Sequence, residues 1–281
     1  MIEIPESICL AKQLSDTLVG KRIEDAVSMH SPHKFAFTYG DTERYPDLMI
    51  GKRFSKAAAH GSWVTMTFED AVFLVSEGSR LFFTTNRSEL PLKHHMLLKF
   101  DDDSYLVTTI QMYGSVICAK TGEFDNEYYR ISLEKPSVLE DAFDESYFRG
   151  LITDRTSAMS AKDFLATEQR IPGLGNGVLQ DILFHAGIHP RTKMKDLSEE
   201  QLMRLYNSLK SVVMEMVEYG GRDTEKDIFG NTCPYNTIMS KNTAGMPCPK
   251  CGTSIEKANY MGGSIYFCRE CQPSSEKDKS V

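Results

Sequence analysis

Four cysteines near the C-terminus carry the strongest chemical signal in the sequence. They form two Cys-x2-Cys pairs with 16 residues between them, and the four are Cys248, Cys251, Cys268 and Cys271. Each pair can grip one metal ion from a tight turn, and four thiolates complete the tetrahedral coordination of zinc. Because no coordination position is left for water, we expect one structural Zn²⁺ per chain.

A glycine-rich turn gives a second signal. Gly173-Leu174-Gly175-Asn176 lies between two segments with helical spacing. Backbone amides at the start of a helix suit a phosphate, and the side chain of Asn176 can donate to an oxygen. The motif is short, so a corner that only packs two helices is an equal alternative.

Two acids, Glu3 and Glu6, stand close to the chain start. Taken alone, they are typical of solvated acids beside a helix N-terminus, where the helix dipole stabilises negative charge.

Composition and charge exclude several protein classes. The chain has 281 residues, 41% of them hydrophobic and 25% charged, as in a folded protein with room for two domains. Its apolar runs are too short for a membrane span, and the acidic start does not resemble a secretory signal, so we expect a cytoplasmic protein, nucleoid-associated if bacterial. The net charge of −7 comes from residues 1–150, whereas residues 151–281 are neutral. If a nucleic acid binds, the C-terminal half should supply most of the contacts to its phosphates.

The hydrophobic pattern changes character near residue 130. Before it, one helix is expected over 8–18, and short segments rich in β-branched and aromatic residues predict strands, which suggests a sandwich or barrel. These strands are expected at 62–68, 71–75, 80–85, 96–100, 105–110 and 114–118. After it, helices are expected at 139–148, 161–168, 178–186 and 197–219, then a hairpin at 259–267 and a frayed tail at 273–281.

The order of these motifs resembles the formamidopyrimidine-DNA glycosylase and endonuclease VIII family over nearly the whole chain. The resemblance is carried by Glu3 and Pro5-Glu6, the β-rich first half, Pro172-Gly173-Leu174-Gly175-Asn176, Ala186-Gly187-Ile188-His189-Pro190 and the four cysteines. It implies an α+β fold: an N-terminal β-sandwich catalytic-type domain at 1–130, a helix-two-turn-helix DNA-binding domain at 131–232, and a zinc finger with a tail at 233–281.

The resemblance also implies base excision repair, in which a damaged base is flipped out and removed and the abasic strand is nicked. The N-terminal amine forms a Schiff base at C1′ of the sugar, since an α-amine is neutral more often than a lysine at neutral pH. Glu3 matches the acid that moves protons, Glu6 a supporting acid, and Asn176 a phosphate ligand. The implied partner is double-stranded DNA with a damaged base or abasic site, bound by a monomer.

Two departures from the family pattern affect the predicted catalytic end. Position 2 is Ile2 where the family has proline, and a large second residue disfavours removal of the initiator methionine, so the free amine belongs to Met1. The basic residue usual after the early strands is replaced near Ser62, with Lys56 and His60 as nearby substitutes.

Two further departures affect DNA contacts. The finger arginine falls at Gly263, which has no charge, and the Arg-x-Phe wedge falls at Gln111-Met112-Tyr113-Gly114. Met112 and Tyr113 are therefore the expected wedge, because apolar side chains can fill the gap left by a flipped base. Packing at a strand end is the alternative for both.

Three hypotheses follow. The first is a DNA glycosylase and abasic-site lyase with an altered amine. The second is a noncatalytic binder of damaged or abasic DNA on the same scaffold, favoured by the lost proline and the two lost basic residues. The third is a zinc-ribbon protein that binds another protein or RNA, which fits the acidic first half but not the N-terminal Pro5-Glu6 pattern.

Overall fold

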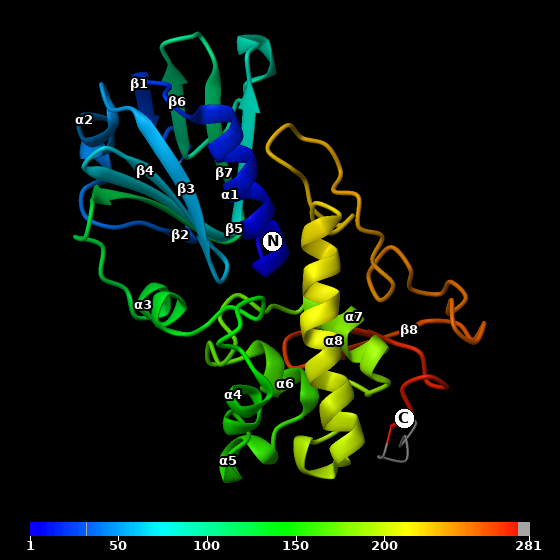
Figure 1. Ribbon diagram of the computed structural model, residues 1–281. Helices are drawn as coiled ribbons and strands as arrows, with labels where there is room; N and C mark the ends of the chain where they lie inside the picture. The colour runs from blue at the N-terminus through cyan, green and yellow to red at the C-terminus, as the bar shows by residue number, and fades with distance from the viewer. Residues whose placement is uncertain (32, 275–281) are drawn as a thin grey trace.

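The first helix, α1 (Ile4–Leu18), starts at the junction of the molecule's two lobes. The computed structural model describes residues 1–31 and 33–274. Helix α1 begins four residues before the expected start because Pro5 occupies the first turn, where no amide hydrogen is needed. The N–H of Glu3 is satisfied by Glu6 Oε2 at 3.1 Å. The apolar face of α1 then packs into the core of the upper lobe in Figure 1.

The upper lobe is built on one seven-stranded sheet. Its main path runs β1-β6-β7-β5-β4-β3, and β2 pairs in parallel with β7. The strands are β1 (Ile23–Ser28), β2 (Ala36–Phe37), β3 (Phe54–His60), β4 (Trp63–Phe68), β5 (Ala71–Thr84), β6 (Met96–Phe100) and β7 (Tyr105–Lys120). The lobe also holds helix α2 (Tyr45–Met49) and the 3₁₀ turns η1 (Thr42–Arg44) and η2 (Arg87–Glu89). The expected N-terminal sheet is confirmed.

Two long strands, β5 and β7, run through both halves of the sheet and let the halves fold over one core. One half of this pair carries β4 and β3 and the other half carries β6 and β1, and apolar side chains from both halves share one core. The register shifts between Glu77 and Ser79, where a bulge separates the halves. The segments expected as four strands, at 71–75, 80–85, 105–110 and 114–118, are therefore two bulged strands.

The lower lobe is helical. It holds α3 (Glu127–Glu134), α4 (Glu145–Gly150), α5 (Asp154–Ser157), α6 (Ala161–Ala166), α7 (Val178–Ala186), η3 (Met194–Asp196) and α8 (Glu199–Glu218). The prediction of a helix at 178–186 is confirmed. The predicted helix at 139–148 is wrong over its first half, because Asp144 caps α4 by accepting the Tyr147 N–H at 2.7 Å, which starts the helix only there.

The last unit is a hairpin of β8 (Glu256–Tyr260) and β9 (Gly263–Phe267), as the sequence predicts. Gln180 of α7 fixes it, accepting the Tyr266 N–H at 3.1 Å, and buried Asp181 accepts the Met239 N–H at 2.7 Å. The expected tail lies mostly outside the described residues. No helix of the described ranges combines the length and the hydropathy that a membrane crossing requires.

The bulge in β5 sets up a sharp stability test at Gly78. A Cβ on Gly78 would lie 2.0 Å from the carbonyl oxygen of Tyr113, so Gly78→Ala must displace the β7 backbone. We expect a loss of about 1–3 kcal/mol, measured by urea unfolding. Gly150→Ala is the matched control, since nothing lies within 4 Å of its Cβ position. Equal stability of the two variants would contradict the close approach of β5 and β7.

Candidate functional site

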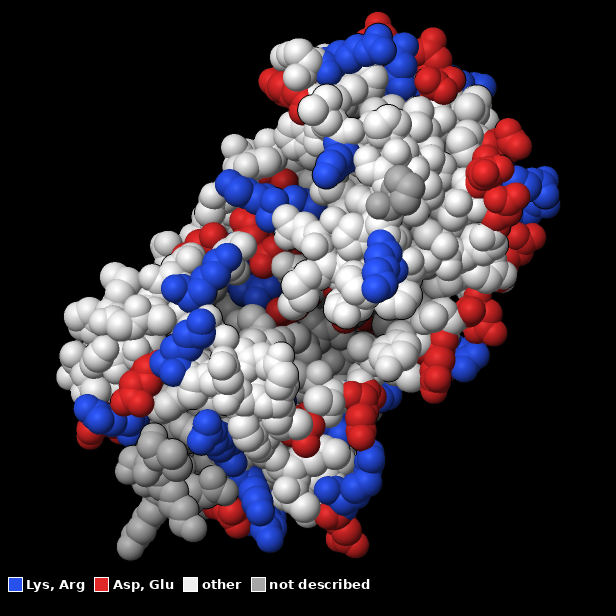
Figure 2. Space-filling view, turned by 180° about the vertical axis from the view of Figure 1, so that it is seen from behind, with Lys and Arg blue, Asp and Glu red and all other residues white. Residues whose placement is uncertain are grey.

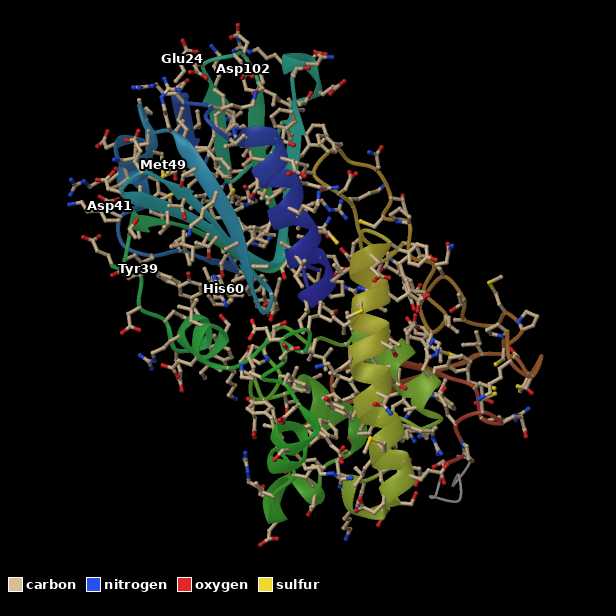
Figure 3. All side chains as sticks on the ribbon, in the orientation of Figure 1. Glu24, Tyr39, Asp41, Met49, His60 and Asp102 are labelled. Carbon is tan, nitrogen blue, oxygen red and sulfur yellow. The ribbon has the colours of Figure 1, made fainter. Side chains whose placement is uncertain are left out.

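A cavity of about 380 Å³ lies where the chain start meets the glycine-rich turn and the tip of the finger hairpin. Six of the residues predicted from the sequence line it, namely Met1, Ile2, Glu3, Ser62, Asn176 and Gly263. Figure 2 shows the molecule hollowed between its lobes, with basic side chains on both sides of the hollow. The acids Glu24 and Asp102 stand at the far end of the upper lobe, away from the junction of the lobes (Figure 3).

The carboxylate of Glu3 forms part of the cavity wall, and both of its oxygens accept hydrogen bonds. Oε2 accepts the backbone N–H groups of Gly175 and Val178 at 3.1 and 2.9 Å, and Oε1 accepts that of Gly177 at 2.9 Å. These are amides of the glycine-rich turn and the start of α7. The turn binds an anion, as its pattern predicts, but the structure gives these amides to Glu3 where a phosphate was expected.

Arg222, directly after α8, neutralises the acids at the chain start. It is 3% exposed, and its guanidinium donates to Glu3 Oε1 at 3.2 Å and to Glu6 Oε2 at 2.6 Å. Burial alone would raise the pKa of Glu6, but the charge and hydrogen bonds of Arg222 outweigh it and hold that pKa below its usual value. Nη2 also donates to the carbonyl of Met1 at 3.2 Å. One guanidinium thus ties Met1, Glu3 and Glu6 together.

Two glycines make this arrangement sterically possible. A Cβ on Gly175 would lie 2.5 Å from the carboxyl carbon of Glu3, and one on Gly177 would lie 1.6 Å from Nη1 of Arg222. The glycines of the turn are therefore required by the close approach of the buried ion cluster.

The first two residues are held from three sides. The Met1 amine lies 2.5 Å from Glu225 Oε2, and the Ile2 N–H donates to the carbonyl of Glu77 at 2.7 Å. The Ile2 side chain is 4% exposed and packs in the core of the upper lobe. The α-amine is consequently fixed beside the cavity.

Lys162 of α6 brings a positive charge to the tip of the finger hairpin. Its side chain lines the cavity and donates to the carbonyl of Tyr260, and burial lowers its pKa. A Cβ on Gly263 would lie 3.3 Å from Lys162 Nζ. The uncharged hairpin tip is thus accompanied by a cation from another element.

Asn176, expected to hold a phosphate, stands at the same place. Its Nδ2 donates to the carbonyl of Ser264 at 2.9 Å, and its Oδ1 accepts from Gln180 at 3.2 Å. In this structure its amide group links the turn to the hairpin. Its DNA contact stays a prediction.

The expected wedge residues lie on an exposed stretch of β7. Met112 and Tyr113 are 57% and 52% exposed, and the Tyr113 ring lies 4.7 Å from that of Phe35 and 6.4 Å from that of Phe37. The Tyr113 carbonyl packs against the Glu77-Gly78 bulge, and Glu77 lines the cavity, but Met112 and Tyr113 are not among the residues that line it. Of the suggested basic substitutes, His60 lines a different cavity, near the junction of the lobes (Figure 3).

The four cysteines converge at the base of the hairpin. Their sulfur atoms lie within 4.8 Å of one another, with 3.8 Å between Cys248 and Cys271 and 3.4 Å between Cys251 and Cys268. Zinc–sulfur bonds of about 2.3 Å in a tetrahedron place sulfurs roughly 3.8 Å apart, so the donor set fits zinc. A zinc ion held by all four thiolates would have no open coordination position for substrate, as in structural zinc sites.

Three side chains are not predicted by the sequence: Lys162, which lines the cavity, and Arg222 and Glu225, which contact Met1. Each comes from a segment distant in sequence from the chain start, and none belongs to a recognisable motif.

The ion cluster predicts that the free energy of unfolding depends on pH. A depressed pKa means that Glu6 stabilises the fold above its unfolded pKa of about 4.3, and that this contribution is lost as pH falls through the lower folded value. Arg222→Met leaves the buried carboxylates without a cation, so we expect a loss of about 3–5 kcal/mol at pH 7 and a smaller loss at pH 5, where protonation relieves them. Urea unfolding at both values measures this.

Arg204→Met is the matched control, because Arg204 pairs with Glu200 on the surface and should contribute less than about 1 kcal/mol. Equal losses for Arg222→Met at the two pH values would contradict a buried charge cluster.

The cysteine cluster predicts one zinc ion per chain by elemental analysis. Cys268→Ser should abolish metal retention and unfold the β8–β9 hairpin while the upper lobe stays folded, because ligation energy is folding energy in such a small unit. Amide signals in NMR spectra distinguish the two units. Cys9→Ser is the control and should keep its zinc; a folded hairpin in metal-free protein would refute the assignment.

Comparison with known proteins agrees with this architecture. Residues 135–227 match the family model described as the formamidopyrimidine-DNA glycosylase H2TH domain. The chain is 26% identical to the formamidopyrimidine-DNA glycosylase of Bacillus licheniformis, covering 97% of this chain and 99% of the relative. It is 27% identical to that of Rippkaea orientalis, covering 97% and 100%.

A solved structure extends the likeness to the fold. The Lactococcus lactis Fpg, in complex with DNA containing an abasic site, superposes with a TM-score of 0.81 at 22% identity, over 97% of this chain and 100% of that one. The H2TH match and the similarity along almost the full length lead to one assignment: the chain belongs to the formamidopyrimidine-DNA glycosylase and endonuclease VIII family.

Proposed function

We propose that this chain is a DNA glycosylase of base excision repair that also cleaves abasic sites, with the α-amine of Met1 as its nucleophile. The relatives named as formamidopyrimidine-DNA glycosylases support the first part, and the Lactococcus lactis complex supports DNA with an abasic site as the partner. The substrate is then a duplex in which the damaged nucleotide is flipped out of the stack.

The observation that carries the proposal is the placement of the amine. The Met1 nitrogen is held beside a cavity of about 380 Å³, within the range of about 300–1,000 Å³ typical of ligand sites. A nucleophile must stand in a fixed position against the reacting carbon, and the contacts of Met1 and Ile2 supply that fixation.

The surroundings suit a DNA strand. The hollow between the lobes has basic side chains on both sides (Figure 2). Lys162 adds a cation at the hairpin tip. Met112 and Tyr113 are exposed on β7, and we expect them to fill the gap left by the flipped nucleotide.

The proposed reaction forms a covalent intermediate. The neutral Met1 amine attacks C1′ of the sugar, and the damaged base leaves with the electrons of the glycosidic bond and the proton released by the nitrogen. The C1′–O4′ bond then breaks and O4′ takes a proton, which gives the Schiff base; loss of a C2′ proton next eliminates the 3′ phosphate. Glu3 and Glu6 anchor Arg222, which holds the Met1 carbonyl, while Lys162 and Asn176 line the cavity and are the expected contacts of the strand backbone.

A noncatalytic binder of abasic or damaged DNA is the second candidate, favoured by two specific contacts. Glu225 holds the amine as an ion pair at 2.5 Å, and both oxygens of Glu3 are already used. A protonated amine is no nucleophile, so a permanent ion pair would leave only binding.

Borohydride trapping with abasic duplex DNA decides between the two. We expect a covalent adduct that maps to Met1 by peptide mass spectrometry, because borohydride reduces a Schiff base to a stable amine. The yield should rise with pH, since only the neutral amine attacks. Intact mass measurement identifies the terminal residue in the same sample.

The matched control adds a cleavable tag ahead of Met1. The tagged chain should give no adduct, since the amine is displaced, and tag removal that leaves Met1 first should restore it. Preferred binding of abasic over intact duplex at one salt concentration, without any adduct, would establish the noncatalytic candidate instead.

A further inference from the structure

Glu225 is the acid that touches the reacting amine. It lies in the segment after α8, its Oε2 is 2.5 Å from the Met1 nitrogen, and its side chain is 20% exposed. Within residues 1–31 and 33–274, this carboxylate makes its ion pair with Met1, and its partial exposure lets it exchange protons with solvent.

Glu3 and Glu6, the other acids of the chain start, form their ion pairs with Arg222 and, within the described part of the chain, none with the Met1 amine. Both oxygens of Glu3 accept from two donors each, and those of Glu6 accept from Arg222 and from the Glu3 N–H. Both side chains are buried, at 4% and 3% exposure. To carry a proton, either would have to give up hydrogen bonds that position the chain start.

We propose that Glu225 is the general base and acid for the N-terminal amine, an inference that rests on the proposed lyase function. The Glu225 carboxylate takes a proton from the Met1 α-ammonium, which frees the nitrogen lone pair to form the bond to C1′ of an abasic sugar. The carboxylic acid returns that proton to the carbinolamine hydroxyl, which leaves as water as the C=N bond forms. No oxidant or further reactant is needed.

The geometry keeps this transfer short. Arg222 holds the Met1 carbonyl and the Glu77 carbonyl holds the Ile2 N–H, so the amine has little freedom to swing away from Glu225. Arg222 itself is anchored by Glu3 and Glu6. Glu225 therefore serves the amine, and the proton delivered to the opening sugar, which the family resemblance assigns to Glu3, is a separate transfer.

Two measurements on Glu225→Gln distinguish a catalytic role of Glu225 from a role in which it only blocks access to the Met1 amine. Without DNA, an amine-reactive ester at fixed pH should label Met1 faster than in the wild type, because the Glu225 carboxylate no longer pairs with the nitrogen. With abasic duplex and borohydride, adduct formation should slow by about 100-fold or more, because the base is gone. A residue that only masks the amine would accelerate both reactions.

Glu218→Gln is the matched control, since Glu218 is an exposed acid of α8, and it should label and trap like the wild type. Glu225→Asp, which keeps a carboxylate, should recover part of the trapping rate. Thermal unfolding checks that each variant is folded.

The outcomes are distinct. Unchanged or faster trapping in Glu225→Gln overturns the role of Glu225 and leaves the proposed function standing. Labelling at the wild-type rate also overturns it, because the ion pair then does not hold the amine in solution. Absence of an adduct from the wild type refutes the lyase function and the catalytic role together, while labelling still reports whether Glu225 binds the amine.

Discussion

The structure at the cavity depends on one buried ion cluster, in which a single guanidinium serves two carboxylates. Arg222 pairs with Glu3 and Glu6, and the excess negative charge is compensated by three amides at the start of α7. A cluster of this kind adds little net stability over apolar packing, but removing one partner is costly. Its effect is positional: it joins the chain start, α7 and the segment after α8 at one point.

The buried ion cluster explains why the glycine-rich turn has the sequence pattern of an anion site although its amides bind the carboxylate of Glu3. The amides point at Glu3, and side chains at Gly175 or Gly177 would displace the carboxylate or the guanidinium. The glycine spacing predicts the chemistry of the turn but not its ligand, because the ligand lies 172 residues away along the chain.

Local patterns predicted what local interactions determine. The helix at 178–186, the strand at 96–100 and the four cysteines were foreseeable because periodicity or spacing encodes them. The start of α1 was misplaced, since Pro5 and Glu3 act as helix-start signals that apolar periodicity ignores. Arg222 and Glu225 were not foreseeable, because only the tertiary fold brings them to the chain start.

At positions 2 and 263 the sequence lacks the family's proline and arginine. In the structure, other contacts occupy both places. A proline at position 2 has no N–H to donate to the Glu77 carbonyl and would empty the buried site that the Ile2 side chain fills. The Cβ of an arginine at position 263 would lie 3.3 Å from the Lys162 ammonium, so the Lys162 side chain would have to shift. Restoring the family residues one by one therefore removes contacts this chain already uses, and the Met1 amine has to be judged with Glu225, Arg222 and Lys162 as its own set of partners.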